Sequence, residues 1–158
     1  MLFIRPMRLG DLDRVMTIEK SSFLYPWQRK SFEMEIGANN LSEYLVACEC
    51  NKEDSLVAYA GMWYLKNVVH ITNLAVDPLY RNYGIGSYLL RCLKYRARLK
   101  GAISMSLEVR PSNKVAQILY RKCGFKICKV RSKYYHDEDA LVMKATLLDS
   151  ATLHPGNR

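Results

Sequence analysis

The spacing of apolar residues along the chain predicts a mixed α/β order of elements. Alternating or continuous apolar runs are typical of strands, and they cover residues 2–6, 43–50, 55–65, 68–76, 103–109, 125–130 and 140–147. Apolar residues three to four positions apart are typical of helices, and they occur at residues 10–22, 28–36, 84–100 and 113–122. The predicted order is therefore β-α-α-β-β-β-α-β-α-β-β, an α/β (α+β) protein.

The chain of 158 residues has the length of one domain with one core. It contains no repeat, no low-complexity segment and no linker rich in proline, glycine or serine. We predict a single domain over residues 1–148. Residues 149–158 lack periodicity, so a flexible C-terminal tail is expected there.

The formal net charge of +9 is unevenly distributed along the chain. Residues 1–90 hold nine basic and ten acidic residues, whereas residues 91–158 hold fifteen and five. The basic excess in residues 91–158 favours binding of an anionic ligand or a location near the ribosome. The alternative is a basic helix face that is exposed to solvent. No nucleic-acid-binding motif is present, so direct binding of nucleic acid is not expected.

Cysteine and hydropathy patterns bear on the compartment. The five cysteines are irregularly spaced, form no CxxC pair and do not cluster with the three histidines. We therefore expect no metal and predict reduced, buried thiols. No apolar run approaches the ~18 residues of a membrane helix, and the N-terminus lacks the apolar stretch of a signal peptide. These patterns predict a cytoplasmic protein without a membrane partner.

The stretch "YRNYGIGS" (residues 80–87) joins a predicted strand to a predicted helix. It has neither the GxxxxGK[ST] spacing of a P-loop nor the GxGxxG spacing of a dinucleotide fold. A glycine turn followed by a helix N-terminus still lets backbone N–H groups converge on an anion. Because Arg81 adds a fixed positive charge, a pyrophosphate is a suitable ligand for this turn. The alternative is an ordinary turn that binds no ligand.

Glu108 lies on the polar face of the predicted strand at residues 103–109. Odd positions of this strand are apolar, and even positions are Ser104, Ser106 and Glu108. A strand between two helical segments is expected to be covered on both faces. The carboxylate therefore needs a partner, a cavity or solvent. An exposed edge-strand glutamate or a structural pair with Arg110 is the alternative to a functional role.

Two motifs in the same order and spacing resemble those of the GNAT acetyltransferases. Arg81-x-x-Gly84-x-Gly86 after "NLAVDP" is similar to the family's loop for the pyrophosphate of acetyl-CoA. "LEVRPSNKVAQILYRKCGF" (residues 107–125) is similar to the second half of its signature. Together with "YY", these motifs most resemble the RimI-type enzymes, which acetylate ribosomal proteins, and "HITNLAV" also resembles the Ard1 type.

The resemblance implies the fold and the reaction. The implied GNAT fold is a mixed, mostly antiparallel sheet of about six or seven strands, splayed in the middle, with about four helices. The implied enzyme is an N-alpha-acetyltransferase that uses acetyl-CoA, without a metal, to modify the N-termini of ribosomal or nascent proteins by direct attack in a ternary complex. The alternatives are acetylation of lysine or small amines, and a non-catalytic CoA-binding or ribosome-docking module. The oligomeric state stays open between a monomer and a weak dimer.

The resemblance also implies roles for individual residues. Glu108 is the implied general base, and Tyr120 is the implied acid for the departing thiolate. His70 is an alternative base, although a buried strand histidine is the simpler interpretation. The implied cofactor-binding residues are Leu74, Ala75, Val76, Arg81, Asn82, Tyr83, Gly84, Ile85, Gly86, Ser87, Asn113 and Tyr120.

Substrate-binding residues are predicted in two aromatic segments. "LYPW" supplies Tyr25 and Trp27, and "KYYHDEDA" supplies Tyr134 and Tyr135. In related enzymes both segments face the peptide groove, and a surface or core aromatic is the alternative for each. An α-amine is the favoured acceptor, because its pKa of roughly 8 makes deprotonation at pH 7 cost about 1.4 kcal/mol, less than a third of the cost for lysine.

Overall fold

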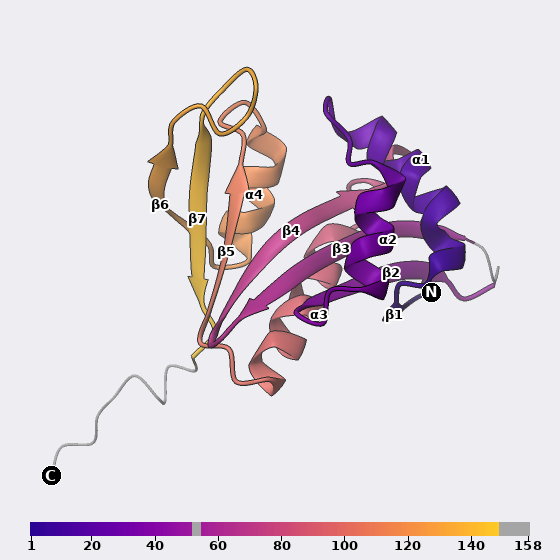
Figure 1. Ribbon diagram of the computed structural model, residues 1–158. Coiled ribbons are helices and arrows are strands. Elements are labelled where there is room, and N and C mark those ends of the chain that lie inside the picture. Colours follow the sequence, from indigo (N-terminus) through magenta and orange to yellow (C-terminus); the bar gives the residue numbers. More distant parts are fainter. Residues whose placement is uncertain (52–54, 149–158) are drawn as a thin grey trace, which may run out of the picture. The chain divides into compact units, whose positions relative to one another are not determined.

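Figure 1 shows the computed structural model, which describes residues 1–51 and 55–148. The predicted flexible tail at 149–158 and most of the turn before the third strand lie outside the described residues. The elements are β1 (Leu2–Pro6), η1 (Leu9–Asp11), α1 (Leu12–Ser22), α2 (Arg29–Gly37), β2 (Ser42–Glu49), β3 (Leu56–Leu65), β4 (Val68–Val76), η2 (Pro78–Tyr80), α3 (Ile85–Leu99), β5 (Ser104–Val109), α4 (Lys114–Lys122), β6 (Lys126–Arg131) and β7 (Ala140–Thr146).

The strands form one seven-stranded sheet in the order β1-β2-β3-β4-β5-β7-β6. β2 pairs antiparallel with β1 and β3, and β7 pairs antiparallel with β5 and β6. β4 and β5 pair in parallel from Val68 to His70. The predicted mixed, mostly antiparallel fold with four α-helices is confirmed. The splaying of the middle strands stays a prediction.

Contacts divide the chain into two compact units. The first unit comprises Met1–Trp63 and Ile71–Leu93, and the second comprises Tyr64–His70 and Lys94–Arg158. β4 and α3 each contribute residues to both units. The prediction of a single domain over residues 1–148 stays a prediction.

The core of the first unit follows from helical and strand periodicity. Val15 and Ile18, three positions apart on α1, both face inward and are fully buried. Phe32 on α2 meets the rings of Tyr44 and Tyr59 edge to face, with centroids 6.1 and 5.7 Å apart. The two sheet tyrosines come from β2 and β3. These contacts hold α1 and α2 against the sheet.

The second unit shows the alternation predicted for residues 103–109. In β5, the buried residues are Met105, Leu107 and Val109, and the half-buried ones are Ser104, Ser106 and Glu108. β7 pairs with β5 over six residues and buries Met143 and Ala145. β5 therefore has an apolar face in the core and a polar face that carries Glu108.

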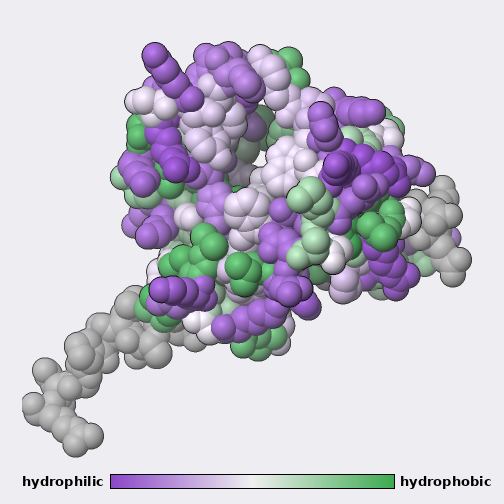
Figure 2. All heavy atoms as spheres, in the orientation of Figure 1, coloured by the Kyte–Doolittle hydropathy of each residue, from purple (hydrophilic) through white to green (hydrophobic). Residues whose placement is uncertain are grey.

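β6 is an edge strand whose six residues are all exposed. Lys126, Lys129 and Arg131 alternate there with apolar residues. Figure 2 shows mainly hydrophilic residues around β6, at the upper left of the view. Charged side chains on an edge strand disfavour pairing with another chain.

Two local expectations need correction. Three of the five cysteines are half-buried or fully buried, but Cys50 and Cys128 are exposed, so the prediction that all five are buried is wrong. The sequence analysis also missed η2, the short turn of helix that begins at Pro78. Among the described residues, no helix is long and apolar enough to cross a membrane.

Candidate active site

The predicted phosphate loop lies in the first unit between β4 and α3. Asp77 caps η2 by accepting a hydrogen bond from the backbone N–H of Leu79 at 2.8 Å. The chain then passes through Asn82 and Gly84, whose φ angles are 67° and 77°. Glycine and asparagine adopt this left-handed conformation at the lowest cost, which explains their presence in a tight turn.

The N-terminus of α3 follows this turn directly. The N–H of Tyr88 donates to the carbonyl of Gly84 at 3.0 Å, so the N–H groups of residues 85–87 precede the first hydrogen bond of the helix. The first turn of α3 contains no acidic residue. Exposed N–H groups at the positive end of a helix dipole favour an anion, and their spacing suits a phosphate group.

Arg81 has a structural role beside its predicted contact with phosphate. Its Nε donates to the carbonyl of Val76 at 3.0 Å, and its guanidinium also donates to Ser22 Oγ at 3.1 Å. These bonds tie the start of the loop to β4 and α1. A guanidinium has five N–H donors, so donors are left for an anion.

Leu74, Ala75 and Val76 are the last three residues of β4. Ala75 is buried in the core of the first unit, whereas Leu74 and Val76 are half-buried. The Val76 carbonyl accepts the bond from Arg81. Their predicted contacts with the pantetheine arm stay a prediction.

Glu108 is the best-defined functional candidate in the second unit. Its side chain is 9% exposed, and each of its two oxygens has a partner. His70 Nε2 lies 2.7 Å from Oε2, and Arg131 donates to Oε1 at 2.8 Å. Burial opposes charge on this carboxylate, but the hydrogen bonds and charges of His70 and Arg131 outweigh it and hold the pKa of Glu108 below its usual range.

The register of the parallel pair explains the contact with His70. His70 of β4 stands opposite Ser106 of β5, two positions before Glu108 and on the same face. The Nδ1 of His70 lies 3.1 Å from Ser106 Oγ. The imidazole can therefore donate from Nε2 to the carboxylate while Nδ1 contacts the serine hydroxyl. This arrangement fixes the orientation of the Glu108 carboxylate.

Tyr120 lies near the C-terminal end of α4 and is 8% exposed. Its ring packs against Phe125 with centroids 5.8 Å apart. Burial raises the pKa of Tyr120 above its usual value, so the phenol keeps its proton at neutral pH.

Asn113 caps the N-terminus of α4. Its side-chain oxygen accepts the backbone N–H of Ala116 at 3.1 Å. The residue is exposed, and the side-chain NH₂ group can donate elsewhere. The cap explains the asparagine structurally, and its predicted contact with the cofactor stays a prediction.

The comparisons with known proteins show the family of the chain. Residues 12–125 match the model of the Acetyltransferase (GNAT) family. The chain belongs to this family. The resemblance predicted from the two motifs is thereby confirmed.

Three relatives are similar over nearly the whole chain. A Bacillus subtilis (strain 168) protein named provisionally as a ribosomal protein bS18-alanine N-acetyltransferase is 42% identical over 146 residues, 91% of this chain and 95% of that protein. The crystal structure of the Escherichia coli ribosomal-protein-S18-alanine N-acetyltransferase has a TM-score of 0.83 at 28% identity and covers 98% of this chain and 99% of its own. Ard1 from Thermoplasma volcanium has a TM-score of 0.83 at 25% identity, with 94% and 99% covered. The resemblance to both enzyme types is thus confirmed.

In this acetyltransferase, the segment between β6 and β7 is fixed to β5 and to the start of α4. Arg110 forms ion pairs with Asp137 at 2.5 Å and Glu138 at 3.2 Å, and Ser112 donates to Glu138 at 2.5 Å. The guanidinium of Arg110 also lies over the ring of Tyr135, at 4.2 Å. Arg110 therefore holds the segment in place, and the acidic residues at 137 and 138 are partly neutralised.

Two of the predicted substrate residues lie in that segment. Tyr134 and Tyr135 meet edge to face at 5.0 Å, and Arg131 lies 5.2 Å from the Tyr134 ring. Arg131 thus contacts both Tyr134 and the carboxylate of Glu108. Burial raises the pKa of Tyr135 to about 12, so its hydroxyl stays protonated.

The other two predicted substrate residues lie in the first unit. Tyr25 is 51% exposed, as a contact residue requires. Trp27 instead packs against Phe32, with centroids 5.4 Å apart, and is half-buried at the edge of the core. The core role of Trp27 is the alternative named in the sequence analysis, and its contact with substrate stays a prediction.

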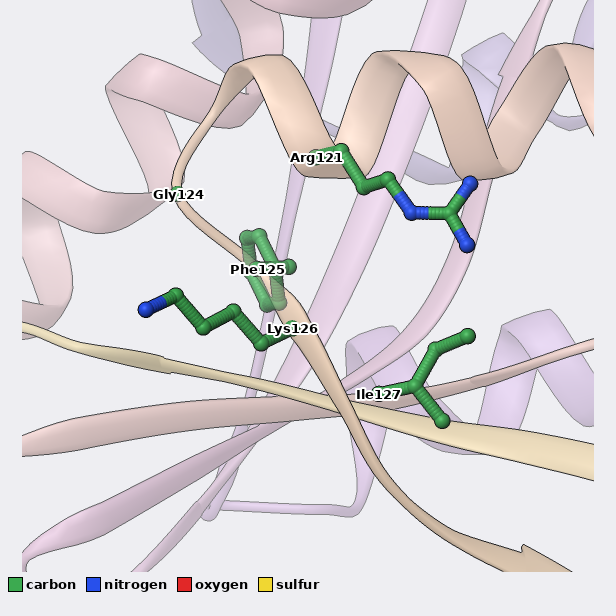
Figure 3. Close-up of a pocket in the computed structure, with 5 residues that line it drawn as sticks. All are labelled: Arg121, Gly124, Phe125, Lys126 and Ile127. Carbon is green, nitrogen blue, oxygen red and sulfur yellow. The ribbon is translucent and has the colours of Figure 1, made fainter.

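A surface pocket of about 380 Å³ contains none of the predicted site residues. Figure 3 shows its lining, with Arg121 at the end of α4 and Phe125, Lys126 and Ile127 on the chain that follows the turn at Gly124. Its position separates it from Glu108 and His70, which project from the polar face of β5 and β4. The pocket is not part of the candidate active site.

Sequence reasoning missed two neighbours of Glu108. His70 was considered only as an alternative base, and Arg131 was not considered. The signal for His70 was available, because even-numbered positions of two adjacent parallel strands in this register share one face. No comparable signal identified Arg131, which reaches Glu108 from β6, two strands away in the sheet.

Proposed function

We propose that this acetyltransferase transfers the acetyl group of acetyl-CoA to the α-amino group of protein N-termini, with a ribosomal protein that begins with alanine as a substrate. The names of the Bacillus subtilis and Escherichia coli relatives support this substrate class. The observation that carries the proposal is the Glu108–His70 pair, a half-buried carboxylate on the polar face of β5 held by a histidine of β4. Because ribosomal proteins are made in the cytoplasm, that is the proposed compartment.

The first unit has the features needed to hold acetyl-CoA. Acetyl-CoA supplies a thioester carbonyl that an uncharged amine can attack. The turn at Gly84 and the N–H groups at the start of α3 suit its pyrophosphate. We propose that residues 81–87 bind this group, that residues 74–76 pair with the pantetheine arm, and that a backbone N–H near Val76 polarises the carbonyl. Asn113 is proposed to bind further along the cofactor.

The second unit is proposed to supply the proton transfers. Glu108 is ionised at neutral pH, because its pKa lies below the usual range. Acting directly or through one water, it takes a proton from the substrate ammonium, while His70 orients the carboxylate. Tyr120 keeps its own proton until the sulfur leaves, and then protonates the thiolate.

The proton energetics favour an α-amine over lysine. With a pKa of roughly 8, an N-terminal ammonium costs about 1.4 kcal/mol to deprotonate at pH 7, whereas lysine at roughly 10.4 costs about 4.6 kcal/mol. A carboxylate with a lowered pKa is a weak base. It is therefore better matched to the more acidic ammonium group.

A set of matched peptides tests the proposal. One peptide begins with a free alanine and has every lysine replaced by arginine, and the second keeps its lysines but has a blocked N-terminus. We expect release of the CoA thiol and an added acetyl group only with the first peptide. Reaction of the second peptide alone, or of small amines alone, would contradict the α-amine proposal.

The non-catalytic alternative has a different signature. A CoA-binding or docking module would be stabilised against heat by CoA but would release no thiol with any amine. Glu108 and Tyr120 disfavour this alternative, since binding alone requires neither a base nor an acid. Thermal shift with CoA and thiol release, measured on the same sample, separate the two.

A further inference from the structure

Glu19 is a buried carboxylate that the proposed reaction does not use. It lies near the end of α1 and is 1% exposed. Its Oε1 accepts the backbone N–H of Trp27 at 2.9 Å, and its Oε2 accepts the hydroxyl of Tyr59. Neither partner is charged, and no ion pair of Glu19 is recorded in the described part of the chain.

Both ends of the segment between α1 and α2 are bonded to this one residue. The backbone carbonyl of Glu19 accepts the N–H of Phe23 at 3.1 Å, and its carboxylate accepts the N–H of Trp27. Pro26 has no N–H to offer. Residues 23–28 form neither helix nor strand. Glu19 therefore closes this segment into a loop whose ends are fixed.

The loop presents apolar side chains to solvent between its two fixed ends. Leu24 is 73% exposed and Tyr25 is 51% exposed, whereas Trp27 packs against Phe32 in the core. Exposed apolar residues on a pre-formed loop reduce the entropy that binding must overcome. A surface of this kind is typical of a recognition loop.

Stability does not explain why a carboxylate lies here. Burial of an acid without a cation is unfavourable, and an apolar side chain of similar volume is usually tolerated at least as well. The N–H of Trp27, however, needs an acceptor in this position, which an apolar residue cannot provide. The chemistry at Glu19 serves the conformation of the loop.

We propose that Glu19 is a positioning residue that fixes the loop at residues 23–28 so that Leu24 and Tyr25 contact the peptide substrate. This inference rests on the proposed function, because it assumes a peptide acceptor. Glu19 itself touches neither the amine nor the thioester. It acts through the backbone of Trp27.

Three variants test this role by steady-state kinetics. Glu19→Leu keeps the volume but removes the acceptor, and we expect the KM for peptide to rise roughly tenfold, with kcat and the KM for acetyl-CoA within about twofold. Glu19→Gln can still accept from Trp27 and can bond the Tyr59 hydroxyl, so it should restore the peptide KM. Tyr59→Phe removes the other partner and should also leave that KM unchanged. An unchanged peptide KM in Glu19→Leu, or an equal loss in all three parameters, would overturn the proposal.

Amide exchange of Trp27 gives an independent measurement. In the unaltered chain we expect this amide to exchange slowly, and in Glu19→Leu at least tenfold faster. If Glu19→Leu does not fold, Glu19→Asp withdraws the acceptor by one methylene group and should show the same direction of both effects. Fast exchange of Trp27 in the unaltered chain overturns the positioning role. A chain that modifies no peptide, with Trp27 still protected, would instead show that the proposed function is wrong.

Discussion

Glu19 in the first unit and Glu108 in the second are both withdrawn from solvent, but their partners differ in charge. Glu19 accepts from an amide and a phenol, and burial raises its pKa to about 7. Burial also raises the pKa of Glu108, but His70 and Arg131 lower it by more. Burial alone therefore does not decide the charge of a carboxylate, and the partner set does. The first arrangement suits a hydrogen-bonding anchor, and the second suits a base.

Glu108→Gln tests the base half of this comparison. The amide keeps the shape but cannot take a proton, so kcat should fall about 10³-fold while the KM for acetyl-CoA stays within about twofold. Steady-state thiol release measures both. Glu33→Gln, at an exposed position on α2, is the matched control and should react normally. A kcat within about fivefold of the unaltered chain would remove Glu108 from the mechanism.

The stability of the two carboxylates should depend on pH with opposite sign. The folded pKa of Glu19, about 7, lies above its ordinary value of 4.5. Its contribution to stability is therefore complete below pH 4.5 and is lost as pH rises through 7. Relative to Glu19→Gln, the unaltered chain should therefore lose about 3 kcal/mol of unfolding free energy between pH 4 and pH 8.

Urea unfolding at several pH values measures this difference. Glu108→Gln is the opposite reference, because the lowered pKa of Glu108 adds stability above its unfolded pKa that is lost toward acid pH. If the difference between the unaltered chain and Glu19→Gln does not change with pH, Glu19 has an ordinary pKa, and the contrast between the two sites fails.

Tyr120→Phe tests the proposed acid, which must keep its proton while Glu108 is ionised. Removal of the hydroxyl leaves the thiolate to be protonated by water, so kcat should fall roughly 10² fold, at the lower end of general-acid effects. Tyr95→Phe, at a residue 64% exposed on α3, is the control. Equal rates for the two variants would leave Tyr120 with only its packing against Phe125.

Arg131→Gln should bring the pKa of Glu108 closer to that of Glu19. Without this guanidinium the pKa of Glu108 rises, so the acidic limb of kcat/KM should move to higher pH. Arg131 is 50% exposed, and solvent screening keeps this the smallest of the effects. Lys129→Gln removes a neighbouring exposed charge of β6 as a control. An unmoved limb would mean that His70 alone sets the pKa of Glu108.

Local patterns predicted most of the fold. The period of two along residues 103–109 placed Glu108 on a polar face, and the predicted strand over residues 68–76 agrees with β4. Gly84 marked the turn before α3, where its φ is 77°, because few residues tolerate a positive φ. The two motifs led to the family. Each of these features depends on residues close together in the chain.

Local periodicity and backbone sterics specify which residues are polar, which face each occupies and where the chain turns, so the amino-acid order is enough to predict them. The partners of each side chain depend on the folded chain. His70 meets Glu108 through the register of β4 and β5, and Glu19 meets Tyr59 across 40 positions of the chain. A pKa depends on charges and burial in space, which no spacing along a single sequence specifies. The roles of the two carboxylates therefore become visible only in the folded chain.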